Sequence, residues 1–154
     1  MTSSLTARLA AAGIILPEAA APAANYVPFV RVGDMLHVSG QLPGVPGALI
    51  TGQLGGGLAL EEGVQAARAC ALNLLGQVRA ACDGDIDGLI RVVKITGFVN
   101  SAPDFGDQPK VVNGASDFLV EALGDAGRHA RSAVGVSALP FGVAVEIEGL
   151  FQIR

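Results

Sequence analysis

Apolar residues recur along the chain with two different periods, and the longer period predicts helices. Between residues 60 and 82 they return every three or four positions, and acidic residues occupy the first turn, where a helix dipole favours them. The segment 110–124 has the same spacing and ends in a glycine. A further short helix is predicted at the N-terminus, with Ser3 or Ser4 as its cap and Gly13 as its end.

The shorter period, together with β-branched residues, predicts strands. Two such runs within residues 26–43 lie on either side of Gly33-Asp34 and predict a hairpin. Residues 90–100 predict a third strand, since they are rich in Val and Ile. The Gly/Pro-rich stretch 43–59 between these strands and the first long helix is predicted to be a loop with at most one short extended piece.

The last two predicted strands, residues 130–138 and 143–153, flank a Pro/Gly turn, so we expect them to pair as a second hairpin. The predicted order is therefore β-β-α-β-α-β-β, preceded by the short N-terminal helix. This order is typical of an α+β fold in which two helices cover one face of a largely antiparallel sheet. At 154 residues the chain has the length of one domain with a substantial core.

The composition predicts an assembly and argues against a nucleic-acid partner. Hydrophobic residues make up 51% of the chain, charged residues make up 16%, and the mean hydropathy is +0.50. So much apolar surface predicts a homo-oligomer that covers part of it. The net charge of −4 and the pI near 5.0 provide no general basic field for phosphate binding.

The two cysteines and the N-terminus indicate the compartment. Cys70 and Cys82 lack the spacing of a zinc site, so we expect reduced, packed thiols of a cytoplasmic protein. The small apolar residues after Arg8 share features with a signal-peptide cleavage region, but a capped helix is the interpretation that we favour. No segment has the length of a membrane-spanning helix.

Arg131 is the first candidate for a binding residue. It opens a predicted strand whose other residues are small and apolar. An arginine at a strand edge is usually a solvated charge, but small neighbours leave room for a ligand, and the planar guanidinium suits a carboxylate. Both interpretations stay open on spacing alone.

Glu146 and Glu148 are the second candidates, because strand geometry places them on one face. Both could point to water, or one could act as a general base near Arg131. A hairpin turn near Pro140 and Phe141 would pair Arg131 with the end of the last strand, several residues beyond Glu146. The two residues would then share a cleft only if another element or subunit supplied its wall.

Other familiar motifs are incomplete. His37 and His129 could each act as a base beside a serine, but no nucleophile elbow or local triad accompanies them. The glycines of residues 52–57 lack the lysine and hydroxyl residue of a phosphate-binding loop. The aspartates of residues 83–87 lack the later ligands of a calcium loop.

With these residues described, the chain resembles the RidA/YjgF family of reactive-intermediate deaminases, also labelled L-PSP endoribonucleases. The resemblance rests on YVPFVRVGDMLHVSGQLP (26–43), NGASDFLVEALG (113–124) and above all ARSAVGVSALPFGVAVEIEG (130–149). It implies a chorismate-mutase-like α+β domain over residues 23–154, with residues 1–22 as an N-terminal extension. It also implies a homotrimer with a site in each cleft between neighbouring subunits.

The resemblance assigns roles to particular residues. Arg131 matches the carboxylate-binding arginine, and Glu146, rather than Glu148, matches the acid associated with the attacking water. The other positions that it places in the pocket are Tyr26, Ser39, Gly40 and Asn113, with backbone groups around Ser132. Ala133 is a departure, because a well-studied branch of the family has cysteine at that position.

The implied activity is the hydrolysis of 2-imino acids, such as the one formed from 2-aminoacrylate, to 2-keto acids and ammonia. Such an enzyme is a hydrolase acting on a C–N bond, and it needs no metal or organic cofactor because an imine is already electrophilic. One alternative is a non-catalytic trimer that binds small carboxylates as a sensor. An endoribonuclease is the other, and the acidic balance and lack of aromatic stacking residues argue against it.

Overall fold

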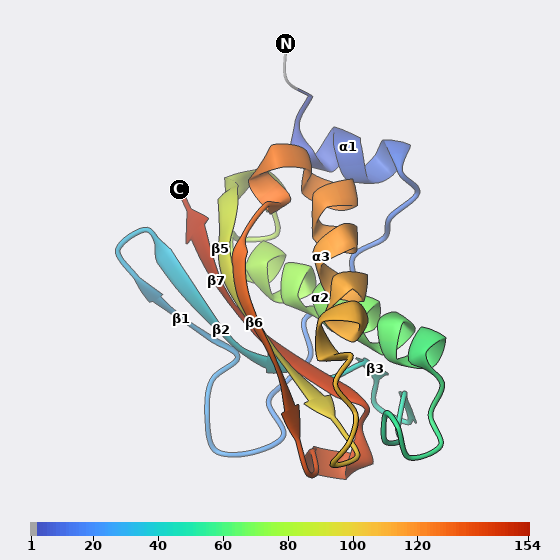
Figure 1. The fold of residues 1–154 in the computed structure, drawn as a ribbon. Coiled ribbons are helices and arrows are strands. Elements are labelled where there is room, and N and C mark those ends of the chain that lie inside the picture. The colour runs from blue at the N-terminus through green and yellow to red at the C-terminus, as the bar shows by residue number, and fades with distance from the viewer. Residues whose placement is uncertain (1–2) are drawn as a thin grey trace.

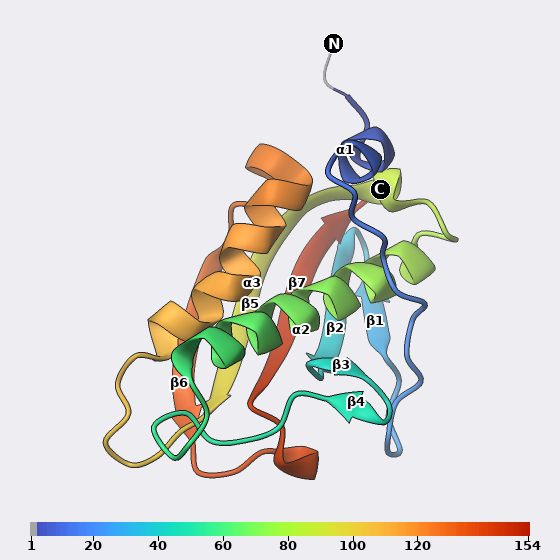
Figure 2. The ribbon, with the colours of Figure 1, turned by 90° about the vertical axis from the view of Figure 1, so that its right-hand side faces the viewer.

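The computed structural model describes residues 3–154 and contains one five-stranded sheet with helices on one face (Figure 1). The strands of this sheet, in spatial order, are β1 (Phe29–Val32), β2 (Met35–Gln41), β7 (Val145–Ile153), β5 (Leu89–Asn100) and β6 (Ala130–Val136). Only β5 and β6 are parallel. Helices α2 (Leu60–Ala81) and α3 (Gln108–Leu123) lie across the sheet (Figure 2). The predicted α+β class and the order of the main elements are confirmed.

Local signals in the sequence set most of the element ends. Gly33 turns the β1–β2 hairpin with a φ of 63°, a region that glycine adopts without strain. Glu62 accepts a hydrogen bond from the Ala59 backbone N–H at 3.1 Å and so caps α2. Helix α3 begins two residues before the predicted start, with Pro109 in its first turn, and ends at Gly124 with a φ of 66°.

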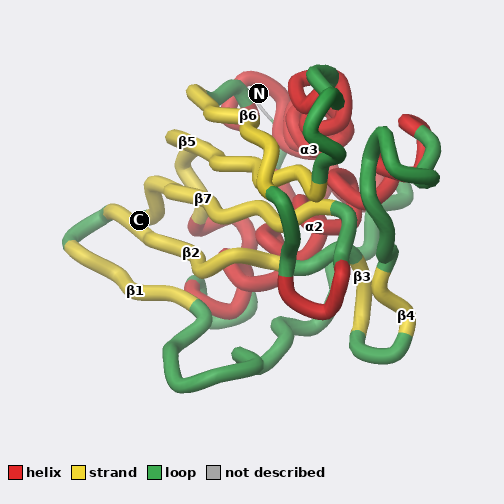
Figure 3. Tube along the Cα trace, turned by 60° about the horizontal axis from the view of Figure 1, so that its bottom comes forward, coloured by secondary structure: helices red, strands yellow, loops and turns green. Residues whose placement is uncertain are grey.

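The core lies between the two helices and the sheet face that they cover. Fully buried side chains on that side include Leu36, Ile147 and Phe151 of the sheet and Leu74 and Phe118 of the helices. The opposite face, here called the open face, is bare within residues 3–154 (Figure 3). Large apolar side chains stay exposed there, among them Val30 at 51%, Val32 at 63% and Val134 at 43%.

The predicted hairpin between the last two strands is wrong. Strands β6 and β7 both form, but β5 lies between them, pairing in parallel with β6 and antiparallel with β7. The segment after β5 continues into α3 and returns as β6, and such a crossover requires parallel strands. The turn η3 (Pro140–Gly142), in which Phe141 has a φ of 59°, then carries the chain from β6 to β7 past the end of β5.

Two smaller elements complete the structure. Within the predicted loop 43–59, β3 (Gly44–Val45) and β4 (Ala48–Leu49) form a short hairpin of their own. Helix α1 (Leu5–Ala11) is capped by the Ser4 hydroxyl, which accepts from Ala7 N–H at 3.1 Å, as predicted. The remaining elements are three 3₁₀ turns: η1 (Ile86–Gly88), η2 (Gly124–Gly127) and η3. Of the helices in residues 3–154, none is both long and apolar enough to cross a bilayer.

Candidate functional site

The predicted site residues fall into two groups at different places in the fold. We call the first group the arginine half and the second the glutamate half. The arginine half contains Arg131, Ala133 and Asn113, and the glutamate half contains Tyr26, Ser39, Gly40 and Glu146. Ser132 belongs to neither group, because its side chain is on the open face beside Thr96 of β5.

In the arginine half, helix α3 holds the guanidinium of Arg131. Nη1 donates to the Ser116 hydroxyl and Nη2 to the Pro109 carbonyl, both at 3.1 Å. These two residues are seven apart on α3 and therefore lie on one face of the helix. An arginine has five N–H donors, and the other three have no partner within residues 3–154. The arrangement fixes the side chain and leaves donors for a ligand.

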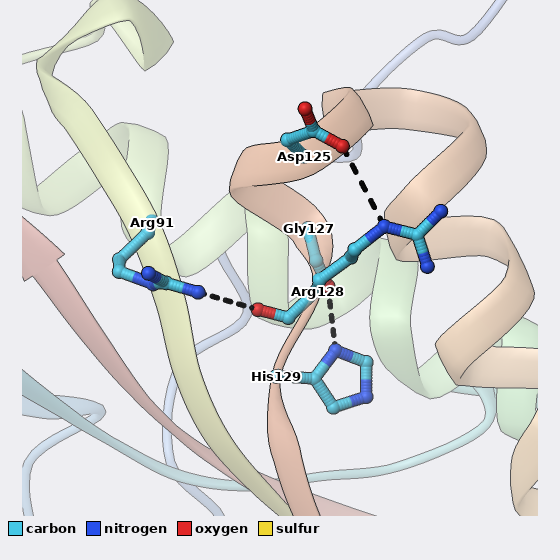
Figure 4. Close-up of polar contacts among 5 residues, drawn as sticks. All are labelled: Arg91, Asp125, Gly127, Arg128 and His129. Carbon is cyan, nitrogen blue, oxygen red and sulfur yellow. Dashed lines mark hydrogen bonds and ion pairs between the residues drawn. The ribbon is translucent and has the colours of Figure 1, made fainter.

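His129 extends this arrangement by one residue. Its Nδ1 lies 2.6 Å from the Gly127 carbonyl (Figure 4), and its Nε2 lies 2.9 Å from the Ser116 hydroxyl. A carbonyl oxygen only accepts, so Nδ1 carries a hydrogen, and when Nε2 carries none it accepts a hydrogen bond from the Ser116 hydroxyl. The Ser116 oxygen is then free to accept from Arg131. His129, which sequence motifs do not explain, thus orients the hydroxyl that holds Arg131.

Asn113 and Ala133 lie beside this arginine. Asn113 is exposed on α3 between Pro109 and Ser116, on the same face of the helix. Ala133 follows Arg131 by two positions on β6, so both side chains point to the side of the sheet where the helices lie. Ala133 packs against the core and adds no reactive group.

In the glutamate half, the carboxyl group of Glu146 packs against Gly40. A bulge in β2 between Val38 and Gln41 brings Gly40 to the open face beside β7. A Cβ built on Gly40 would collide with the Glu146 carboxyl group, so this glycine is what lets the acid lie flat on β2. Glycine is used here for close approach rather than for an unusual φ.

Glu146 differs from its neighbour Glu148 in its surroundings. Glu146 is half-buried, and burial raises the pKa of its carboxyl group, with a smaller contribution from the negative charge of Glu148. Glu148 is exposed on the same face. Glu146 therefore holds a proton more tightly than an ordinary glutamate, as a general base poised closer to neutral pH does.

Ser39 and Tyr26 are the other two members of the glutamate half. The Ser39 hydroxyl donates to the Val27 carbonyl at 2.8 Å, and its N–H donates to the Pro28 carbonyl at 2.9 Å, which fastens the segment that carries Tyr26 to β2. Tyr26 is 48% exposed. Tyr26 and Gly40 both line a pocket of about 420 Å³ at this end of the sheet.

Within one chain the two halves cannot meet. Arg131 pairs with the buried Ile95 and points to the helix side, whereas Glu146 pairs with Phe98 and points to the open face. Strand β5 also separates β6 from β7. The two charged residues are therefore on opposite faces of the sheet, and a cleft with both needs two copies of the chain.

Cys70 lies in the core and Cys82 packs against it. Both cysteines are free, and burial raises the pKa of the Cys70 thiol well above its ordinary value. A thiol kept neutral in this way is a poor nucleophile, in keeping with its prediction as a packed core residue. Residues 3–154 contain no group of three or more His, Cys, Asp or Glu side chains placed to hold a metal ion.

Sequence patterns missed the residues that position Arg131. Ser116 and the Pro109 carbonyl contact it from a helix that begins 23 residues before it. The signal available was a polar serine on the edge of an apolar helix stripe, seven residues after a proline. A serine in this position carries no sign of its role in the sequence, because only the tertiary structure shows that strand β6, with Arg131, runs beside it.

Comparisons with known proteins cover nearly the whole chain. Residues 6–148 match the sequence model of a family described as "YjgF/chorismate mutase-like, putative endoribonuclease". Protein TCP17 of Trypanosoma cruzi is 54% identical over 152 residues, which cover 97% of this chain and 94% of that protein.

Solved structures share the fold. The Agrobacterium tumefaciens protein Atu1372 superimposes with a TM-score of 0.89 at 45% identity, over 97% of this chain and 92% of that one. Escherichia coli TdcF, solved with bound serine, gives a TM-score of 0.63 at 26% identity, over 89% and 94%. The family match, over residues 6–148, includes both the arginine half and the glutamate half.

Proposed function

Because the chain belongs to the YjgF/RidA family, as its sequence motifs indicate, we propose that it is an imine deaminase. Its substrates would be 2-imino acids, including the one derived from 2-aminoacrylate. Water adds to the imine carbon to give a carbinolamine, the C–N bond then breaks, and the products are a 2-keto acid and ammonia. The observation that carries the proposal is the Arg131 guanidinium, fixed on α3 with three N–H groups unpaired within residues 3–154.

Arg131 would bind the carboxylate that every 2-imino acid carries. A guanidinium and a carboxylate form two parallel charge-assisted hydrogen bonds, which fix both position and orientation. Fixing the carboxylate places the neighbouring imine carbon as well, since it is one bond away. The bound serine of TdcF is also a small molecule with a carboxylate, which supports a ligand of this class.

Glu146 would act on the water. Its half-buried carboxyl group has a raised pKa, and a base of that kind accepts a proton from water more readily as the water attacks. The same group can then return the proton to the leaving nitrogen. Backbone groups near Gly40 and Ser132 would contact the imine nitrogen, while Tyr26, Ser39 and Asn113 would shape the cleft.

The site would be shared between copies of the chain, in the homotrimer that the family resemblance implies. The arginine half of one copy would face the glutamate half of the next. Contacts between unlike surfaces of identical subunits close into rings, and such a ring would cover apolar residues of the open face. Native mass spectrometry should give a mass three times 15.5 kDa, and a protein that remains a monomer at assay concentration would contradict the shared site.

A coupled assay tests the activity. An amino acid oxidase generates the imine from its amino acid in the cuvette, and semicarbazide traps whatever imine is left. Purified protein should shorten the life of the imine in proportion to its concentration. No acceleration with any imine, while 2-keto acids still bind in calorimetry, would favour the non-catalytic carboxylate binder. RNA cleavage that survives purification and disappears with Arg131→Ala would favour the endoribonuclease instead.

A further inference from the structure

The pocket beside the glutamate half has a size suited to a ligand group. It has a volume of about 420 Å³, within the range of about 300 to 1,000 Å³ that is typical of small-molecule sites. It lies between the N-terminal segment 20–28, the end of β2 and the β3–β4 hairpin, with Phe141 of η3 at its edge. Only Tyr26 and Gly40 in this lining are among the predicted site residues.

Hydrogen bonds to helix α2 hold two walls of this pocket in place. Gln77 donates to the Ala20 carbonyl at 2.8 Å, and Arg79 donates to the Pro17 carbonyl at 3.1 Å. Gly76 permits this approach, because a Cβ there would lie 2.7 Å from the Pro17 oxygen. On the other side, the Asn73 amide donates to the carbonyls of Leu42 and Gly44 at 2.9 and 2.8 Å. Side-chain hydrogen bonds from α2 therefore hold the N-terminal segment and the start of the β3–β4 hairpin in fixed positions around the pocket.

The chemistry of the lining selects apolar groups. Among residues 3–154, every residue that lines the pocket is uncharged. Most of them are Ala, Pro, Leu, Gly or aromatic residues. The one side-chain amide on α2 that reaches it, Asn73, uses both of its hydrogens on backbone carbonyls. The lining offers no charged partner to an ionised group, which would lose its hydration here, whereas a hydrocarbon group would gain from burial.

The pocket and the candidate base meet at Gly40. Gly40 belongs to the lining of the pocket, and the carboxyl group of Glu146 packs against the same residue. A substrate whose reacting carbon lies near Glu146 would therefore have its substituent within reach of the pocket.

We infer that this pocket receives the side chain of the substrate and that the enzyme prefers 2-imino acids with large apolar side chains, branched or aromatic. The inference rests on the proposed function. The segment 20–23, which lies before or at the start of the domain expected from the resemblance, becomes a determinant of specificity. A methyl side chain would leave most of the pocket unfilled.

The test compares imines generated from alanine, leucine and phenylalanine. Each additional methylene in a hydrophobic pocket changes kcat/KM by about 10-fold or more, so the leucine and phenylalanine imines should exceed the alanine imine by at least that factor. Ala21→Phe and Leu49→Trp fill the pocket from opposite walls. Each should lower kcat/KM for the large imines about 10-fold or more while the alanine imine stays within about twofold.

Ala19→Phe is the matched control, since Ala19 is exposed on the same segment and outside the lining. It should leave all three substrates unchanged. Equal turnover of small and large imines by the natural protein, or full activity of both filled variants on large imines, would overturn the pocket assignment and leave the deaminase proposal intact. Failure of the natural protein on all three imines would instead overturn the proposed function, and this inference with it.

Discussion

Arg131 and Glu146 are the two charged residues of the candidate site, and the protein holds them in different ways. Arg131 is anchored by hydrogen bonds to Ser116 and Pro109, and the serine is in turn oriented by His129. Glu146 forms no side-chain hydrogen bond within residues 3–154 and is held by packing against Gly40. One group is pre-oriented to bind, and the other is partly desolvated and ready to take a proton.

The comparison shows which free-energy cost accompanies each role: loss of side-chain freedom for binding the carboxylate, and desolvation for accepting a proton. A hydrogen-bonded cation on a rigid helix binds a carboxylate with little loss of side-chain freedom. Partial burial of a carboxyl group disfavours its ionised form and so costs folding free energy. Such groups are common at functional sites, where the raised pKa serves proton transfer. The two halves should therefore respond differently to substitution: one in substrate affinity, the other in turnover, pH dependence and stability.

The largest effect is expected from Glu146→Gln. If Glu146 is the general base, as proposed, its loss should lower kcat about 100-fold or more with little change in KM. The melting temperature should stay the same or rise, because a half-buried charge is removed. Steady-state kinetics and calorimetry check both parts. Glu148→Gln, on the same face and exposed, is the control and should keep its kcat at neutral pH; an unchanged kcat in Glu146→Gln would leave that residue a structural role only.

Arg131→Ala should have the next largest effect. Loss of a charge-assisted double contact costs about 2 to 4 kcal/mol, or roughly 30- to 1,000-fold in kcat/KM. The matched control is Arg128→Ala, which removes a nearby arginine whose only ion pair within residues 3–154 is with the exposed Asp125. If both variants stay within a few-fold of the natural protein on every active imine, the carboxylate does not bind at Arg131.

Ser116→Ala tests whether the contacts from α3 position the guanidinium. Arg131 loses one of its two acceptors, so KM should rise about 3- to 10-fold with kcat nearly constant. Ser116→Thr keeps the hydroxyl and should keep KM near the natural value. A fall in stability without any change in KM would show that Ser116 only supports the fold.

The smallest effect is a shift in the pH profile. Glu146 must be ionised to act as a base, so activity falls as pH drops through its raised pKa. Removing the negative charge of Glu148 with Glu148→Gln lowers the pKa of Glu146, so the acid limb of kcat/KM should move to lower pH. Burial is the larger cause of the raised pKa of Glu146 and is unchanged in this variant, so the pKa should stay above that of an ordinary glutamate. Asp104→Asn removes an exposed carboxylate elsewhere and should leave the profile unchanged; a shift to higher pH in Glu148→Gln would contradict the assignment.

Periodicity predicted the elements well but could not predict how they pair. The helices over 60–82 and 110–124 bury a stripe that repeats every three to four residues, so their sequence shows them directly. The strand 130–138 also shows itself, but its partner β5 lies more than thirty positions earlier, and the intervening α3 decides the pairing. The turn residues near Pro140 predicted a hairpin because they do reverse the chain direction. The two strands that they connect are not neighbours, however, since β5 lies between them.

The residues of the candidate site were named from the sequence, whereas their geometry was not. The motif around Arg131 and Glu146 identified both by resemblance, yet local spacing gave no sign that they face opposite ways. The contacts of Ser116, His129 and Gly40 depend on tertiary packing, so no local pattern identifies them. Hairpin register predicted that Arg131 and Glu146 could share a cleft only if another element or subunit supplied its wall. In the observed sheet the two side chains are separated for a different reason, because they point to opposite faces.

The most direct test of the shared site mixes two inactive variants. Arg131→Ala and Glu146→Gln, with different affinity tags, are co-expressed, and oligomers that carry both tags are purified. If each site takes its arginine from one chain and its glutamate from the next, every trimer that carries both variants has one of its three sites with both residues, so the purified mixed oligomers should regain roughly a third of the natural activity. The shared site predicts this recovery. Mixed oligomers no more active than the separate variants would show that the two halves do not meet across subunits.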